Sequence, residues 1–231
     1  MLALSLAEWD RAVFLAINQR VHHPVLDAVM PYVTDLGLGH VQVLLLLLVA
    51  VASAWRAGEL RSAHGIAAAV ARALLSRSAW LGPTVAAVVL SGLAANALKA
   101  DERRRPWWFY HLEHRRGRFV DVQVRLVPGQ YPGKVRGFPS GHTATSVGIA
   151  CTLQLLRRRL GLRRRVLAAL WIGAGAIAFS RVYLASHWPL DIVGGAAFGV
   201  AGAVASVVLL RRVWARIGEP GNSAPEAQEN G

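Results

Sequence analysis

Two short segments of this chain place ionisable side chains at the ends of apolar runs. One extends from Ser180 to Asp191 and contains an arginine, a histidine and an aspartate; the other, residues 139–142, reads Pro-Ser-Gly-His. Ionisable groups beside membrane hydrocarbon cost free energy and persist only with partners, so a functional role is the first hypothesis for them. Together the two segments indicate an active site that handles phosphate.

His187 and Asp191 lie four residues apart, and Pro189 between them suits the first turn of a following helix. Residues at this spacing are neighbours on a helix, so the Asp191 carboxylate can accept a hydrogen bond from Nδ1–H of His187. That bond leaves Nε2 with a lone pair for phosphorus, and the carboxylate stabilises the cationic phosphohistidine that follows. We predict that His187 is the nucleophile and that Asp191 orients it.

The start of the apolar run at residues 138–156 offers groups that hold an oxyanion. Ser140 can cap a helix, Gly141 lets the backbone approach an anion closely, and the free N–H groups of the first turn lie at the positive end of the helix dipole. His142 starts a different helix from His187, so it is free to protonate the leaving group and then to deprotonate the attacking water. We predict Ser140 and Gly141 as phosphate-binding residues and His142 as the general acid and base.

Three basic residues adjoin the same helix ends: Lys99, Arg105 and Arg181. Phosphoryl transfer is catalysed mainly by positioning and by fixed positive charge around the non-bridging oxygens. These cations are predicted to bind the phosphate in place of a metal, and no cofactor is expected.

The composition favours a protein of several membrane spans. Of the 231 residues, 54% are hydrophobic, and the mean hydropathy is +0.37. This leaves too little polar surface for an ordinary soluble domain. Uncharged apolar runs, most of them near the ~20 residues that a bilayer requires, occupy residues 38–55, 78–98, 138–156, 166–180 and 192–210. We predict an all-α polytopic membrane bundle with five or six transmembrane helices.

Three regions follow from this pattern. Residues 1–37 carry a charge every few positions and are predicted to form interfacial helices or a broken sixth span. Residues 38–217 form the transmembrane catalytic domain, in which residues 56–77 make a basic surface helix between two spans. Residues 218–231 are rich in Gly, Pro, Asn and Glu and are predicted to be disordered.

The net charge of +13 would suggest nucleic acid as a partner of a soluble protein. Here the basic residues cluster in the connections between apolar runs, so topology is the better explanation, and the expected partners are membrane lipids rather than nucleic acid. Counts of basic residues on the two sides are nearly equal, thirteen against eleven. The short connection at residues 157–165, with six arginines, is expected in the cytoplasm. The predicted active site then faces the extracytoplasmic side.

These segments resemble three motifs of the type 2 phosphatidic acid phosphatase (PAP2) superfamily, which includes the vanadium-dependent haloperoxidases and glucose-6-phosphatase. Residues 139–142 match the second motif, and Ser-Arg, five residues, His, three residues, Asp at residues 180–191 match the third. The first motif usually has six residues between a Lys and an Arg-Pro pair, whereas five separate Lys99 from Arg105. Losing one residue turns a helical position by about 100°, so either the helix exit is rewound or Arg103 or Arg104 supplies part of the charge.

The resemblance implies a PAP2-like helical core that hydrolyses a lipid phosphate or diphosphate without metal, through a phosphohistidine. It also implies a bacterial inner or plasma membrane location with an extracytoplasmic active site. The expected substrate is undecaprenyl diphosphate, and phosphatidylglycerophosphate or phosphatidic acid is the alternative. A lipid-linked phosphotransferase and a non-enzymatic lipid-carrier transporter are the other hypotheses.

Other conspicuous residues have plainer interpretations. His40 is interpreted as a structural hydrogen-bonding residue. The aromatic residues 107–110 are interpreted as an interfacial belt beside a span. His111, Glu113 and His114 form only a weak metal-binding pattern, and a solvated loop is the preferred interpretation.

Overall fold

The computed structural model describes residues 5–60, 65–99, 103–118, 122–130 and 134–217, so the predicted tail at residues 218–231 lies outside the described residues. The helices are α1 (Leu6–Leu15), the π-helical segment η1 (Ala16–Arg20), α2 (Pro24–Asp35), α3 (Gly39–Arg56), α4 (Ile66–Ser76), α5 (Ser78–Ala97), α6 (Pro106–Arg115), α7 (Gly141–Leu155), α8 (Arg157–Leu160), α9 (Arg164–Tyr183) and α10 (Pro189–Ile217).

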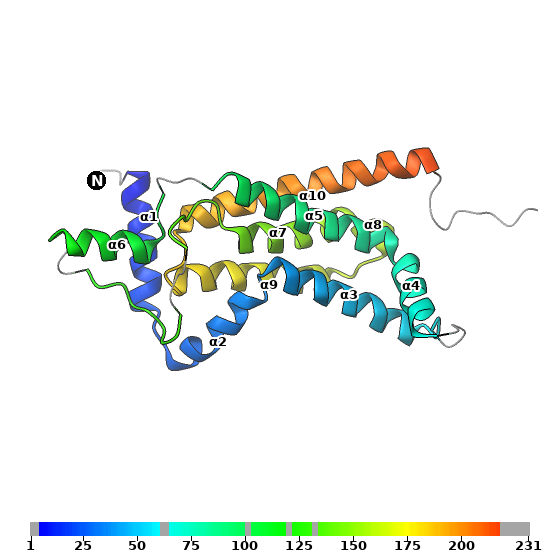
Figure 1. Cartoon of the computed structure of the whole chain (residues 1–231), viewed down its shortest axis with the longest axis horizontal. Coiled ribbons are helices and arrows are strands. Elements are labelled where there is room, and N and C mark those ends of the chain that lie inside the picture. The colour runs from blue at the N-terminus through cyan, green and yellow to red at the C-terminus, as the bar shows by residue number, and fades with distance from the viewer. Residues whose placement is uncertain (1–4, 61–64, 100–102, 119–121, 131–133, 218–231) are drawn as a thin grey trace, which may run out of the picture.

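The long helices α3, α5, α7, α9 and α10 run along the long axis of the molecule, and α1, α2 and α6 gather at one end (Figure 1). Among the described residues, four helices are long and apolar enough to cross a membrane, namely α3, α5, α9 and residues 189–213 of α10. The fifth predicted run forms α7, which has only 15 residues. It packs against α5, α9 and α10. The predicted all-α membrane bundle is therefore confirmed, with α7 as its short inner helix.

Glycines on α10 let this helix lie directly on α7. A Cβ atom on Gly195 would be 2.4 Å from the Ser140 carbonyl oxygen, and one on Gly199 would be 2.5 Å from that of Ala144. Small residues of this kind allow close helix contacts in membranes. The contact continues to the helix starts, where the Ser140 N–H donates to the Asp191 carbonyl oxygen at 3.0 Å. The first turns of α7 and α10 are thereby fixed side by side.

The N-terminal residues form helices that pack on the end of the bundle bearing the predicted site. A capping box between Ser5 and Glu8 starts α1. The buried Asn18 donates to the carbonyl oxygens of Arg125 and Tyr183, both at 3.0 Å. This amide therefore ties η1 to the end of α9 and to the connection between α6 and α7.

The connection between α5 and α7 contains more structure than the sequence predicted. Residues 106–115, interpreted as part of a loop, form α6, which begins with Pro106 at its first position. Tyr110 is buried in a cluster with Phe14 and Trp188. The predicted interfacial belt is therefore wrong for Tyr110, which belongs to the core that supports the His187 segment.

Candidate active site

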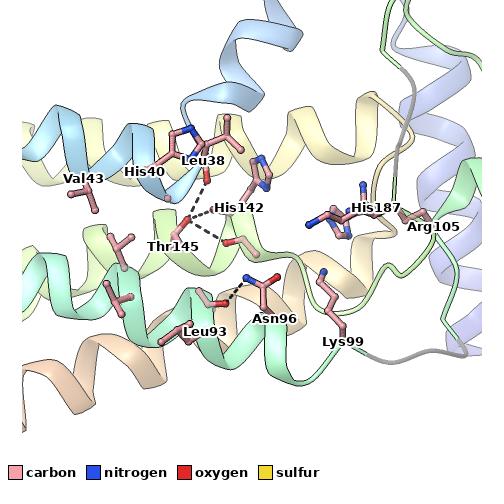
Figure 2. A pocket seen from close by; sticks show the side chains of 17 residues that line it. Leu38, His40, Val43, Leu93, Asn96, Lys99, Arg105, His142, Thr145 and His187 are labelled. Atoms are coloured by element: carbon pink, nitrogen blue, oxygen red, sulfur yellow. Dashed lines mark hydrogen bonds between the residues drawn. The ribbon is translucent and has the colours of Figure 1, made fainter.

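Five of the eight predicted site residues line one cavity of about 580 Å³: Lys99, Arg105, Gly141, His142 and His187. They come from the exit of α5, the start of α6, the start of α7 and the connection between α9 and α10. Figure 2 shows Lys99, His142 and His187 around a common space, with Arg105 beside His187. The helix ends that carry these five residues thus meet at one cavity.

His187 is almost completely buried, with 1% of its surface exposed. Its Nδ1 lies 3.3 Å from Oδ2 of Asp191, and the same oxygen accepts a 3.0 Å hydrogen bond from the Trp188 backbone N–H. Burial, and then the positive charges of Arg181, Arg105 and Lys99, hold the pKa of His187 well below its ordinary value. The imidazole is therefore neutral at neutral pH, the form with a free lone pair.

The start of α7 has the predicted anion-binding geometry. Ser140 caps the helix, because its Oγ accepts from the Thr143 backbone N–H at 3.4 Å and from Thr143 Oγ1 at 3.0 Å. A Cβ atom on Gly141 would meet nothing within 4 Å, so the backbone at this position opens onto the cavity. Ser140 is buried and acts on the helix start rather than lining the cavity.

His142 is held from one side by the turn between α2 and α3. A Cβ atom on Gly37 in that turn would lie 2.9 Å from Cδ2 of His142. Oγ of Ser146, which donates to the His142 carbonyl oxygen at 2.7 Å, accepts a 2.7 Å hydrogen bond from Nε2 of Gln42. Gly37 of the α2–α3 turn and Gln42 of α3 therefore pack the start of α3 against the part of α7 that carries this histidine.

Lys99 reaches the cavity despite the shortened first motif. Its Nζ donates to the carbonyl oxygens of Gly137 at 3.2 Å and Pro139 at 2.5 Å. Burial, and then the charge of Arg105, lowers the pKa of Lys99 to about 8. Arg105 is buried, and its Nε donates to the Arg136 carbonyl oxygen at 3.0 Å. Both cations are thus anchored on the segment that leads into α7.

Neither Arg103 nor Arg104 is among the residues that line the cavity. Arg103 instead contacts two carboxylates, Oδ1 of Asp191 through Nε and Oδ2 of Asp10 through Nη2, each at 2.5 Å. The Arg104 carbonyl oxygen accepts from Nε1 of Trp188 at 2.8 Å. Lys99 therefore lines the cavity, whereas Arg103 and Arg104 have other partners, so a phosphate-binding role for Lys99 stays the prediction.

Arg181 differs from its predicted place, because it is buried and is not among the residues that line the cavity. Its Nη1 donates to Oγ1 of Thr34 at 2.7 Å, while Nε has no hydrogen-bond partner among the described residues. The Arg181 carbonyl oxygen accepts from the backbone N–H groups of Ser186 and His187 at 3.0 Å. This arginine therefore shapes the turn that carries His187 and adds positive charge behind it.

Several residues at the site carried no recognised signal in the sequence. Gly37, His40, Asn96 and Lys134 line the cavity, and the sequence alone favours a structural role for His40. Asp10 of α1 contacts the side chain of Arg103, and Asp10 is 4% exposed. Its spacing of four from the buried Phe14 was the available signal, because the two residues share one face of a helix.

The cavity has two chemically different ends. Lys99, Arg105, His142 and His187 lie at one end. Apolar residues of α3 and α5 line much of the other end, namely Val43, Val88, Val89 and Leu93. Figure 2 shows Val43 and Leu93 on the side of the cavity away from His187 and Arg105. This arrangement can hold an anionic headgroup at the histidines and an apolar chain between α3 and α5.

Comparisons with solved structures give the same architecture. The crystal structure of Aquifex aeolicus LpxE is similar with a TM-score of 0.61 and 25% identity, over 86% of this chain and 94% of that one. A PAP2 type phosphatidylglycerolphosphate phosphatase from Bacillus subtilis is similar with a TM-score of 0.55 and 19% identity, over 92% and 89% of the two chains. The second likeness establishes the fold alone.

Curated relatives match over shorter stretches. A lipid A 1-phosphatase of Rhizobium etli is 34% identical over 52% of this chain and 46% of its own length, and a lipid A 4'-phosphatase of Bacteroides thetaiotaomicron is 36% identical over 41% and 40%. The chain thus spans about half the length of the curated relatives it matches, or less. The model of the PAP2 superfamily matches residues 80–215, which carry all three motifs. The chain belongs to the PAP2 superfamily.

Proposed function

We propose that this protein is a membrane phosphatase that hydrolyses a terminal phosphate from a lipid phosphate or diphosphate through a phosphohistidine. The observation that carries the proposal is the cavity in which His142, His187, Lys99 and Arg105 adjoin an apolar slot between α3 and α5. A soluble phosphate ester needs no such slot, whereas a lipid buries its chain there while its headgroup meets the histidines.

In the first step, Nε2 of His187 attacks phosphorus. The bond between phosphorus and the leaving oxygen breaks as the N–P bond forms, and His142, which takes up a proton when the anionic phosphate binds beside it, gives this proton to the leaving oxygen. Lys99, Arg105 and the N–H groups at the start of α7 stabilise the charge on the non-bridging oxygens. Asp191 stabilises the imidazole as it becomes cationic.

In the second step, water attacks phosphorus of the phosphohistidine. His142, now neutral, takes a proton from the water, the N–P bond breaks, and inorganic phosphate leaves with His187 neutral again. The cycle consumes one water molecule and restores both histidines.

The proposal is tested with protein purified in detergent and given lipid phosphates in the presence of excess EDTA. Release of inorganic phosphate that EDTA leaves unchanged is expected. A phosphotransferase would require an acceptor other than water for turnover. A lipid-carrier transporter would release no phosphate at all.

Two lipid classes are candidate substrates. Undecaprenyl diphosphate is the one expected from the sequence, and lipid A is suggested by the names of the Rhizobium etli and Bacteroides thetaiotaomicron relatives.

A second cavity of about 480 Å³ adjoins the first and shares Asn96, Lys99 and Lys134 with it. No carboxylate among the described residues lines either cavity. This supports a headgroup with a further anionic group beyond the reacting phosphate, rather than phosphatidic acid.

Lys134 gives a test of this preference. Lys134→Ala should lower kcat/KM for diacylglycerol diphosphate by about tenfold, the value of one charged hydrogen bond, and should change kcat/KM for phosphatidic acid by less than about twofold. Arg115→Ala is the matched control, because Arg115 is exposed and lines neither cavity. Equal losses on both lipids would contradict a second anionic contact.

We expect deprotonation of Lys99 to produce an alkaline limb in the pH profile of kcat/KM. Its pKa is lowered to about 8, so the fraction of protein with a charged Lys99 falls as the pH rises through that value. We expect kcat/KM, which reports the free enzyme, to decline above about pH 8. Lys99→Arg should move this limb upward, because the guanidinium keeps its charge. An unchanged limb in this variant would assign the titration to another group.

We also propose that the site faces the extracytoplasmic side of a bacterial inner or plasma membrane. The arginine-rich residues 157–165 lie at α8, at the other end of the bundle from α6 (Figure 1). Short basic connections stay in the cytoplasm, which supports this orientation.

A further inference from the structure

Asp10 of α1 joins the N-terminal helix to the start of α10. It is 4% exposed, and its two oxygens have different partners. Oδ2 contacts Nη2 of Arg103 at 2.5 Å, while Oδ1 accepts the backbone N–H of Leu190 at 2.8 Å. Leu190 is the second residue of α10, so Asp10 satisfies one of the free donors at the start of the helix that carries Asp191.

Arg103 stands between Asp10 and Asp191. Its Nε contacts Oδ1 of Asp191 at 2.5 Å, while its Nη2 is bound to Asp10. The other oxygen of Asp191, Oδ2, lies 3.3 Å from Nδ1 of His187. The four side chains thus form one row from α1 to the imidazole: Asp10, Arg103, Asp191 and His187.

The charge of this row depends on Asp10. Arg103 alone would neutralise Asp191 and weaken its attraction to a cationic imidazole at the other oxygen. With Asp10 present, the three charged members carry one net negative charge beside His187. This matters because the other charges around the imidazole, on Lys99, Arg105 and Arg181, are positive and oppose formation of a cationic ring.

We propose that Asp10 is a positioning residue for catalysis, which holds Arg103 and the start of α10 so that Asp191 is aligned and negatively charged when the imidazole becomes cationic. This inference rests on the proposed phosphohistidine chemistry. Asp10 lies outside the three sequence motifs and is not among the residues that line the cavity, so it acts through Arg103 and Asp191 rather than on the substrate.

Asp10→Asn separates this role from simple helix packing. The amide oxygen can still accept a hydrogen bond from the Leu190 N–H. The negative charge that Asp10 places beside Arg103 is lost. We expect kcat to fall by about tenfold or more, as for other residues that orient a reacting group, with KM changed by less than about twofold. Glu8→Gln is the matched control, because it removes one charge from the exposed face of the same helix and should leave kcat unchanged.

A double-mutant cycle tests the route of the effect. If Asp10 acts through Asp191, the loss caused by Asp10→Asn should largely vanish in an Asp191→Asn background. Arg103→Lys is a second test in case Asp10→Asn folds poorly. It replaces the guanidinium that bridges two carboxylates with an ammonium, and it should reproduce the loss in kcat.

Normal kcat in a folded Asp10→Asn protein, or equal losses in both backgrounds of the cycle, would overturn the inference and leave the proposed function intact. Absence of phosphate release by the unsubstituted protein would overturn the proposed function first and this inference with it.

Discussion

Replacing His187 with alanine should reduce phosphate release by about five orders of magnitude, to the background left by the remaining groups of the site. The reason is that the imidazole supplies the atom that attacks phosphorus. The cations and the start of α7 would still bind the substrate, so its affinity should change little. Inorganic phosphate release from a lipid phosphate, measured at saturating substrate, gives the comparison.

The matched control for this prediction is His114→Ala. His114 is an exposed histidine of α6 that does not line the catalytic cavity, and its loss should leave turnover unchanged. Substantial hydrolysis by the His187→Ala protein would show that the attacking group is another side chain or water itself.

Replacing His142 with alanine should have an effect that depends on the leaving group. For a lipid alcohol, which leaves poorly without a proton, we expect a loss of about 10³-fold, within the range for general acid and base catalysis. For a nitrophenyl phosphate ester, whose leaving oxygen needs no proton, formation of the phosphoenzyme should slow by less than about tenfold. Hydrolysis of the phosphoenzyme should be slow, because no base activates the water.

This difference has a direct readout in burst kinetics. The His142→Ala protein should release about one equivalent of nitrophenol rapidly and then turn over slowly, whereas the unsubstituted protein should show steady turnover. Equal losses for both leaving groups would exclude His142 as the general acid, and a loss without any burst would exclude it as the base of the second step.

Much of this site could be predicted because local geometry ties residue spacing to position. The spacing of His187 and Asp191 around Pro189 places both at one helix start, and Ser140 caps α7 as its sequence indicates. The apolar runs became helices, since backbone groups in a membrane must be satisfied within the segment. Contacts between distant segments could not be found in this way: Asp10 and Arg103 are 93 residues apart.

Helix geometry could not predict the direction of Lys99 in the shortened first motif. Removing one residue would turn Lys99 away from its target if the lysine stood on the helix. However, α5 ends at Ala97 with Leu98 as its C-cap, so Lys99 lies beyond the last turn and its direction is set by the connection instead. Its Nζ is held by the carbonyl oxygens of Gly137 and Pro139.

Arg181 shows a limit of a different kind. The residue type and position fitted a phosphate ligand, but burial and a hydrogen bond to Thr34 of α2 hold its side chain outside the lining of the cavity. Packing of α2 against α9 decides this, and the spacing within one segment carries no information about it.

The central claim is that His187 becomes phosphorylated during turnover, and identification of the covalent intermediate tests it most directly. The His142→Ala protein is mixed with a nitrophenyl phosphate ester labelled in the phosphate, quenched in alkali, digested and mapped by mass spectrometry. We predict one phosphate per protein, stable to alkali and released by acid, on the peptide that contains His187. A phosphate on any other residue, or a nitrophenol burst without a phosphorylated His187, would contradict the central claim.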